Sequence, residues 1–379
     1  MNKQSYWDIF CKVIDNFGDI GVCWRLCTDL ASRGYRIRLW VDDPSALVWM
    51  APGGCEGVEI IHWLDSKACA LALTQIAKLT LPQVLIEAFG CEPEVAYLEL
   101  IEQKYQSDPA QKPPIWINLE YLSAEKYVEN CHGLSSPTQQ YPLLSQKKYF
   151  YYPGYTAKTG GLIRDPVQQL ELKGLNKDYW LKQHQVEIEP HPEHILVSLF
   201  CYDQAPLKPL LDFLIHRNKP STLLVTDCVG VAGLKQMMKW FYSNQTHQLQ
   251  IHYLPKMSQK DYSCLLHCCD LNIVRGEDSA TQALWAQAPF IWQLYPQEDA
   301  YHLEKLSAFL KLFQMPASIT NWFYDLNGAS QKSLQALNLK EWGLHFDKMR
   351  AQLLEQNDLC SQLLSFIDTT SQAQGFKKA

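Results

Sequence analysis

The sequence lacks the features that most readily assign a chain to a partner or a metal. Its 13 cysteines include no CxxC pair, and no stretch reaches the roughly 18 apolar residues needed to span a bilayer. Lys and Arg number 34 against 40 Asp and Glu, so the formal net charge is −6. These absences argue against a paired-cysteine zinc knuckle, against a membrane protein, and against direct nucleic-acid binding, which usually needs a basic surplus.

The beginning of the chain also lacks the pattern of a targeting signal. Its short apolar run is interrupted by Asp8, Lys12 and Asp15, unlike the apolar region of a secretory signal peptide. An odd number of scattered cysteines is typical of a reducing compartment. We therefore expect a cytoplasmic protein.

Two groups of cysteines resemble metal ligands only superficially. Cys23 and Cys27 can share a helix face, and Cys264 to Cys269 brings three cysteines close to His267. Free cysteine is among the most buried residue types, so packing in the core is the better interpretation. We expect no metal and no cofactor.

The remaining composition is that of a folded α/β protein of about two domains. The chain has 379 residues, 47% hydrophobic and 20% charged. Apolar, β-rich runs alternate with longer amphipathic stretches, which is typical of parallel sheets with helical crossovers. The expected strands lie at 7–14, 36–42, 58–64, 83–89 and 115–122, then at 194–200, 221–227, 249–255, 271–276 and 289–295. Helices are expected at 22–33, 68–79 and 341–368, with fraying after 370.

Two doubly wound, Rossmann-like domains facing a cleft are the expected architecture. We place the first at 1–175, with a C-terminal helix at 351–379 packing back on it, and the second at 176–350. The stretch 155–192 is poor in long apolar runs and is interpreted as the inter-domain region. Its glycine-rich segment 154–164 is either a hinge or a simple connection.

The sharpest local motif is DNFGDIG at 15–21, directly after the first expected strand. Ligands bind outside the carboxyl ends of strands in open α/β sheets, so this turn is well placed. It is neither GxGxxG nor a P-loop, and its carboxylates, Asp15 and Asp19, would repel phosphate and attract a cationic or polyhydroxylated group. The alternative is structural: Asp19 caps the next helix, and Asp15 closes an Asx turn.

The second motif is RGEDS at 275–279, again between a strand and a helix. Helix N-terminal N–H groups and the guanidinium of Arg275 suit a diphosphate. The alternative is that Glu277 and Asp278 merely favour the helix dipole. A carboxylate-rich loop in one domain and an anion-binding loop in the next describe a donor and acceptor cleft.

Aromatic side chains near the strand ends add weaker signals. Phe200 and Tyr202 are two residues apart and are expected to face the same side, where they either stack on a nucleobase or pack in the core. Glu120 and Tyr121 follow the fifth strand and could face the cleft.

Several blocks of the sequence resemble the EarP family of bacterial protein-arginine rhamnosyltransferases, which modify translation elongation factor P. The resemblance rests on segments that run in order along the chain: 7–26, LWVDD at 39–43, INLEYLSAE at 117–125, GGLIR at 160–164, RGEDS at 275–279 and 295–309. It implies a GT-B glycosyltransferase fold, in which the C-terminal domain holds dTDP-β-L-rhamnose and the N-terminal domain binds the acceptor protein. It also implies inverting transfer to an arginine without a metal, which activates elongation factor P for rescue of ribosomes stalled at polyproline.

The resemblance further implies roles for individual residues. Asp15, Asp19 and Glu277 match the family's essential acidic residues. Its donor contacts match a set in the second domain: Phe200, Tyr202, Gln259, Arg275, Gly276, Asp278 and Ser279. The family's aromatic contact to thymine is missing after 254–255, where this chain has Lys256, and Tyr253 is the candidate to compensate.

Two other functions remain open from the residues alone. One is another nucleotide-sugar transferase or epimerase that acts on a small acceptor. The other is a non-catalytic adaptor that binds elongation factor P or a nucleotide sugar. An adaptor has no need of two aspartates opposite RGEDS, so the acidic loop favours an enzyme.

Overall fold

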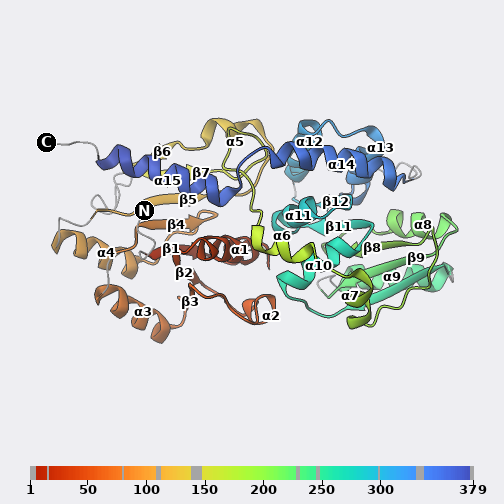
Figure 1. Cartoon of the computed structure of the whole chain (residues 1–379), viewed down its shortest axis with the longest axis horizontal. Helices are drawn as coiled ribbons and strands as arrows, with labels where there is room; N and C mark the ends of the chain where they lie inside the picture. The colour runs from red at the N-terminus through yellow and green to blue at the C-terminus, as the bar shows by residue number, and fades with distance from the viewer. Residues whose placement is uncertain are drawn as a thin grey trace. The chain divides into compact units, whose positions relative to one another are not determined.

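The computed structural model describes residues 6–14, 17–78, 81–107, 112–137, 147–227, 231–244, 248–297, 299–329 and 337–375. Its contacts divide the chain into two compact units (Figure 1). Unit 1 comprises Met1–Val167 and Gln356–Ala379, and unit 2 comprises Gln168–Glu355. Each unit has its own sheet and its own core, so each is described separately.

Unit 1 is built on a seven-stranded sheet with the order β3-β2-β1-β4-β5-β7-β6. All neighbours are parallel except β6 and β7, which are antiparallel. The strands are β1 (Tyr6–Cys11), β2 (Arg36–Val41), β3 (Val58–His62), β4 (Val84–Ala88), β5 (Ile115–Leu119), β6 (Ser135–Ser136) and β7 (Lys148–Tyr151). The helices are α1 (Gly18–Ser32), α2 (Leu47–Met50), α3 (Ser66–Lys78), α4 (Val95–Ser107), α5 (Lys126–Cys131) and α15 (Leu359–Gly375).

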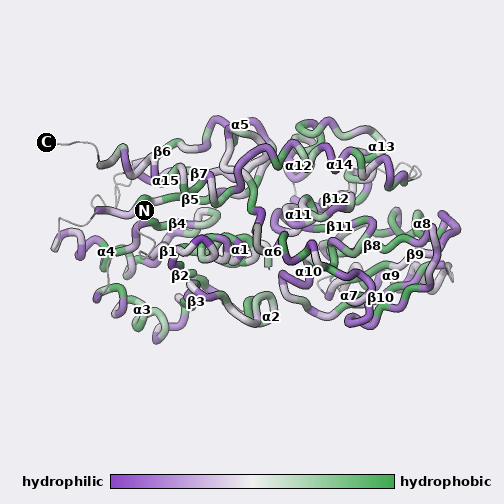
Figure 2. The backbone as a smooth tube through the Cα atoms, in the orientation of Figure 1, coloured by the Kyte–Doolittle hydropathy of each residue, from purple (hydrophilic) through white to green (hydrophobic). Residues whose placement is uncertain are grey.

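The central strands of the sheet of unit 1 are buried on both faces, which agrees with their largely hydrophobic sequences (Figure 2). Successive side chains point to opposite faces, so Ile9 packs in the cluster with α1 and α15, while Phe10 packs with residues of α3 and α4. Cys23 and Cys27 are fully buried in the first cluster. The core therefore lies on both sides of β1, β4 and β5 and fixes the carboxyl ends of these strands.

Unit 2 repeats the same topology with five parallel strands in the order β10-β9-β8-β11-β12. They are β8 (Ile195–Leu199), β9 (Ser221–Thr226), β10 (Leu249–Leu254), β11 (Leu271–Arg275) and β12 (Phe290–Gln293). The helices are α6 (Pro166–Leu172), which begins at the end of unit 1, α7 (Lys177–Gln183), α8 (Lys208–His216), α9 (Val231–Asn244), α10 (Gln259–Cys268), α11 (Gly276–Trp285), α12 (Tyr301–Leu312), α13 (Ala317–Leu326) and α14 (Leu339–Leu354). Cys268 and Cys269 are buried in a hydrophobic cluster of this unit.

Both sheets reverse their strand order at one point, which is where ligands bind in open α/β folds. In unit 1 the reversal lies between β1 and β4, and in unit 2 it lies between β8 and β11. The motif at 15–21 follows β1, and the motif at 275–279 begins at the last residue of β11. The fold class expected from the sequence, α/β with two Rossmann-like domains, is confirmed.

The structure corrects several local expectations. Helix α1 begins at Gly18, four residues earlier than expected, and the short strands β6 and β7 were not expected at all. Helix α15 continues to Gly375, into the segment expected to fray. Part of the stretch 155–192 is not a linker, because Trp180 and Leu181 are buried in the core of unit 2.

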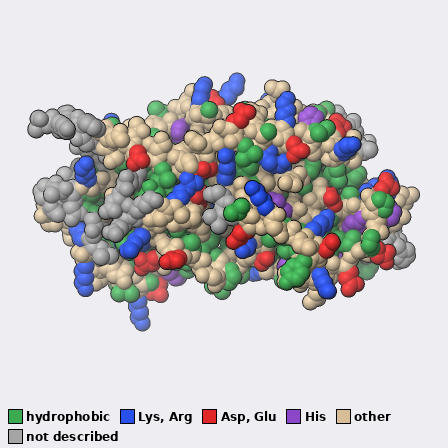
Figure 3. Space-filling model, viewed as in Figure 1, with side chains coloured by type: hydrophobic (Ala, Val, Ile, Leu, Met, Phe, Trp, Pro, Cys, Tyr) green, Lys and Arg blue, Asp and Glu red, His purple; other side chains and the backbone are tan. Residues whose placement is uncertain are grey.

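The distribution of charge on the surface and the hydropathy of the helices both agree with a nearly balanced charge and the lack of long apolar runs in the sequence. On the face drawn in Figure 3, acidic and basic side chains are interspersed. None of the helices in the described ranges is both long enough and apolar enough to cross a bilayer.

Candidate active site

Asp19 lies in the first turn of α1, close to the end of β1, and is only 2% exposed. Its Oδ2 accepts a hydrogen bond of 2.9 Å from the backbone N–H of Ile14. Its Oδ1 accepts a hydrogen bond of 3.2 Å from the hydroxyl of Tyr121. The expectation that Asp19 could be the N-cap is wrong, because Phe17 occupies that position and Asp19 is already helical.

The partner of Asp19 comes from another strand end of the same sheet. Tyr121 follows β5, and its ring stacks on Phe89, which follows β4, with centroids 4.3 Å apart and planes inclined by 14°. Strands β1, β4 and β5 are consecutive neighbours. The three loops therefore assemble one cluster at the carboxyl edge of the sheet. Asp15, the other acidic residue of the motif, lies outside the described residues.

In unit 2 the equivalent edge carries a cation between aromatic rings. The guanidinium carbon of Arg275 lies 4.4 Å from the ring centroid of Phe200 and 4.9 Å from that of Tyr202. Arg275 also donates a 3.2 Å hydrogen bond to the carbonyl of Cys201. Such contacts stabilise a cation by about 0.5–2 kcal/mol each and hold it in one orientation.

Cys201 lies beside this cation but is chemically inert. Burial raises the pKa of the Cys201 thiol to about 12, although the charge of Arg275 lowers it. The thiol therefore stays protonated at neutral pH and is no nucleophile. The chemistry of this edge rests on Arg275 and the helix that follows it.

Helix α11 begins directly after Arg275 and supplies backbone N–H groups at the same place. Gly276 adopts a φ of 65°, a left-handed conformation that glycine tolerates best. Asp278 and Ser279 are buried in the first turn, where Oδ2 of Asp278 accepts a 2.8 Å hydrogen bond from Gln282. A helix N-terminus beside an arginine can bind a phosphate group.

Glu277 pairs with a lysine that the motifs do not contain. The ammonium of Lys305, on α12, donates to Oε1 of Glu277, and both side chains are mostly buried. Lys305 also faces the ring of Trp292 at 5.9 Å. The carboxylate of Glu277 is therefore held by a cation of its own unit.

The remaining donor candidates lie at different distances from this cluster. Gln259 begins α10, and Tyr262, one turn later, packs edge-on against Phe200 with centroids 5.6 Å apart. Tyr253 is 54% exposed on β10, the edge strand of the sheet. Lys256 is exposed on the loop between β10 and α10. The structure thus groups the residues of 200–202 and 275–279. It places Gln259 on the same helix as Tyr262, which contacts Phe200, and it places Tyr253 on a different strand.

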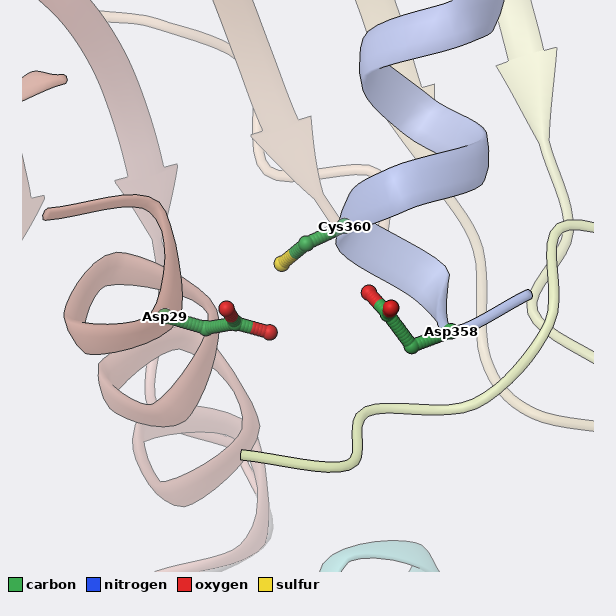
Figure 4. A group of neighbouring side chains, drawn as sticks. All are labelled: Asp29, Asp358 and Cys360. Atoms are coloured by element: carbon green, nitrogen blue, oxygen red, sulfur yellow. The ribbon is translucent and has the colours of Figure 1, made fainter. Parts of the chain in front are cut away.

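A second acidic cluster lies elsewhere in unit 1 (Figure 4). Asp29 on α1 and Asp358 and Cys360 at the start of α15 point toward one another, with candidate ligand atoms within 4.8 Å. The guanidinium of Arg33 already binds both carboxylates, at 2.7 Å from Asp29 and 2.7 Å from Asp358. A cation is thus supplied by the chain itself, and the cluster joins α1 to α15.

Sequence reasoning missed Lys305 and Phe89, and it named Tyr121 only as a side chain that could face the cleft. Lys305 lies in the block 295–309, but nothing in its spacing connects it to Glu277, 28 residues earlier. Tyr121 and Asp19 are 102 residues apart. Only the strand order brings such pairs together, so no local signal could have found them.

Comparison with known proteins identifies the chain. The family model described as elongation factor P (EF-P) rhamnosyltransferase EarP matches residues 7–368. A protein-arginine rhamnosyltransferase of Pseudomonas putida is 39% identical over 327 residues, 81% of each chain. One of Pseudomonas aeruginosa is 34% identical and covers 96% of this chain and 99% of its own.

Solved structures agree with this match. One, described as the structural basis for EarP-mediated arginine glycosylation of translation elongation factor EF-P, is 25% identical, has a TM-score of 0.59 and covers 97% of this chain and 99% of its own. The spinosyn forosaminyltransferase SpnP is 10% identical with a TM-score of 0.51 over 96% of this chain and all of its own, which shows the fold alone.

The chain is a glycosyltransferase of the GT-B fold. It has two Rossmann-like units, with Asp19 near the carboxyl ends of the strands in unit 1 and Arg275 at the carboxyl end of β11 in unit 2. The chain belongs to the EarP family, and it is a protein-arginine rhamnosyltransferase.

Proposed function

We propose that this enzyme transfers L-rhamnose from dTDP-β-L-rhamnose to one arginine of translation elongation factor P, with inversion at the anomeric carbon, in the cytoplasm and without a metal or other cofactor. The family match over residues 7–368 supports the acceptor, which the family description names. The observation that carries the chemistry is Asp19, a buried carboxylate held at the strand-order reversal of unit 1.

The acidic group answers a chemical difficulty of this reaction. An arginine side chain has a pKa above about 12, so no carboxylate can deprotonate it before attack. We propose that Asp19, helped by Asp15, accepts hydrogen bonds from the guanidinium and orients one nitrogen toward the anomeric carbon. As the N–C1 bond forms, Asp19 takes the proton of that nitrogen, and orientation supplies much of the rate.

Unit 2 acts on the leaving group in this proposal. The bond between C1 and the β-phosphate oxygen breaks, and the oxygen keeps the electron pair. Arg275 and the N–H groups at the start of α11 stabilise the negative charge that develops on dTDP. Phe200, Tyr202 and Gln259 hold the nucleotide, with Tyr253 at its edge, and Asp278 and Ser279 contact the diphosphate and sugar.

For Glu277 we propose one of two roles. It either completes the acidic surroundings of the acceptor guanidinium or holds the donor sugar. The ion pair with Lys305 affects either role, because the acceptor guanidinium or the donor sugar would bind a carboxylate that already contacts the ammonium of Lys305.

Replacement of the proposed base tests this function. Asp19→Asn keeps a similar size but cannot take the proton, so we expect it to bind dTDP-β-L-rhamnose normally and to lose transfer by at least about 100-fold. Transfer is measured by mass spectrometry as one added deoxyhexose on one arginine of elongation factor P, and donor binding by calorimetry.

The matched control is Asp65→Asn. Asp65 also follows a parallel strand of unit 1, but it is exposed and accepts a 2.9 Å hydrogen bond from the N–H of Lys67. This variant should transfer at the wild-type rate. Near-normal transfer by Asp19→Asn would show that Asp19 is not the base, and an unmodified acceptor with the wild-type enzyme would refute the proposed reaction.

A further inference from the structure

Asp19 is held from two sides, and one of the two donors is a side chain without an assigned role. The backbone N–H of Ile14 fixes Oδ2, and the hydroxyl of Tyr121 fixes Oδ1. A carboxylate with a donor on each oxygen cannot rotate without breaking one hydrogen bond. Tyr121 is 38% exposed and Asp19 is 2% exposed, so the tyrosine is the more exposed member of the pair.

The ring of Tyr121 is itself held in place by a residue with unusual backbone geometry. Phe89 has a φ of 58°, which is an outlier for a bulky side chain, and such outliers cluster at functional sites. Its backbone N–H donates a 2.7 Å hydrogen bond to the carbonyl of Leu119, the last residue of β5. The following N–H, of Gly90, donates to Oδ1 of Asn118 at 3.3 Å.

The end of β4 is therefore tied to the end of β5, and the tie places the Phe89 ring flat against Tyr121. A left-handed phenylalanine is unfavourable by itself and persists only where its surroundings determine it. Here the surroundings consist of the stacked ring and the two hydrogen bonds donated by the backbone N–H groups of Phe89 and Gly90. The arrangement leads from β4 through Phe89 and Tyr121 to the carboxylate of Asp19.

We propose that Tyr121 is a positioning residue of the transfer reaction: it orients the Asp19 carboxylate toward the acceptor guanidinium, and Phe89 fixes Tyr121 by stacking. The inference rests on the proposed role of Asp19 as the base. The hydroxyl donates to the carboxylate, so its loss frees the carboxylate to rotate.

Tyr121→Phe tests the proposal, because it removes only the hydroxyl. We expect kcat to fall about 10- to 100-fold, as misplacement of a reacting group does, while KM for dTDP-β-L-rhamnose stays within about twofold. A role in folding alone would leave kcat of the folded fraction unchanged.

The control is Tyr127→Phe, a tyrosine of similar exposure in the same unit, whose ring packs edge-on against Tyr152. Its kcat should equal that of the wild type. Phe89→Gly keeps a residue that accepts the left-handed φ but removes the stacked ring, so it should lower kcat in the same direction as Tyr121→Phe. Wild-type kcat in Tyr121→Phe would overturn the proposal, and wild-type kcat in Phe89→Gly would overturn the role of the stack.

A double-mutant cycle separates this inference from the proposed function. In transfer, Asp19→Asn combined with Tyr121→Phe should be no slower than Asp19→Asn alone, because the tyrosine acts through the carboxylate. In thermal unfolding, the two substitutions should also be non-additive, and this measurement needs no substrate. Additive shifts of the unfolding midpoint would refute the contact between Asp19 and Tyr121, whether or not the enzyme modifies elongation factor P. Failure of the wild-type enzyme to modify elongation factor P would refute only the proposed function.

Discussion

The cluster that joins α1 to α15 gives a sharp prediction about stability. Arg33, the C-cap residue of α1, binds Asp29 through Nε at 2.7 Å and Nη2 at 3.3 Å. The same guanidinium binds Asp358 at 2.7 Å and the hydroxyl of Ser361 at 2.7 Å. The perturbation is Arg33→Met, which keeps much of the aliphatic stem and removes the charge and all of these donors.

The magnitude follows from how deeply the partners are buried. The side chain of Asp29 is wholly buried, and that of Asp358 is 18% exposed. Removing one partner of a buried ion pair costs about 3–5 kcal/mol, because the other charge stays unpaired. Arg33 is itself 23% exposed, so water can enter and reduce the cost. We expect a loss of about 3 kcal/mol in the free energy of unfolding, or about 6–12 °C in Tm for a unit of this size.

Urea unfolding and calorimetry measure this loss, with the two units treated as separate transitions where they do not coincide. The matched control is Lys158→Met, which breaks an exposed ion pair of the same unit, with 3.6 Å between Lys158 and Glu129. Such a pair contributes about 0–1 kcal/mol. If Arg33→Met cost no more than Lys158→Met, the cluster would not be a structural ion-pair network and the reasoning would fail.

Two further predictions concern backbone packing and pH. Gly160→Ala should lower the free energy of unfolding of unit 1 by about 1–3 kcal/mol, because a Cβ at this position would lie 2.2 Å from the buried ring of Tyr151. Urea unfolding measures the loss, and Gly53→Ala is the control, because a Cβ at position 53 meets open space. Equal stability of the two variants would contradict the overpacking. Burial lowers the pKa of His132 and of His267. Below about pH 6.5 these two histidines therefore bind more protons in the unfolded chain than in the folded protein. Because of this difference, the free energy of unfolding should decrease as the pH falls toward about 5. The fall should be smaller in His132→Gln, and an unchanged pH dependence would show that this histidine does not contribute.

Most strands could be predicted from the sequence because the inner strands of both sheets are buried on both faces. Runs such as 36–42 and 221–227 contain consecutive apolar residues, at 39–41 and 223–225, and the structure places β2 and β9 within these runs. The start of α1 was less predictable. Gly18 and Gly21 suggest a loop, but the backbone N–H of Gly21 already donates to the carbonyl of Phe17 in a helical turn.

The motifs of the site were visible in the sequence, whereas the contacts that hold them were not. Arg275 is the last residue of a recognisable strand, but its stacking on Phe200 depends on β8 and β11 being neighbours. The pairing of Glu277 with Lys305 depends on where α12 packs. Periodicity and spacing describe one element at a time, so interactions between distant elements need the strand order as additional information.

The two units show how one topology can provide opposite electrostatics at the same place. Both sheets have the equivalent strand order and both present loops at its reversal. After β1 the chain places a carboxylate in the first helical turn, whereas at the end of β11 it places an arginine before the helix and a glycine at its first residue. Asp19 thereby makes its edge suited to a guanidinium, and Arg275 makes its edge suited to a diphosphate. The chemistry of each unit is set by a few loop residues, so exchanging the charge at position 19 or 275 should abolish transfer while leaving both sheets intact.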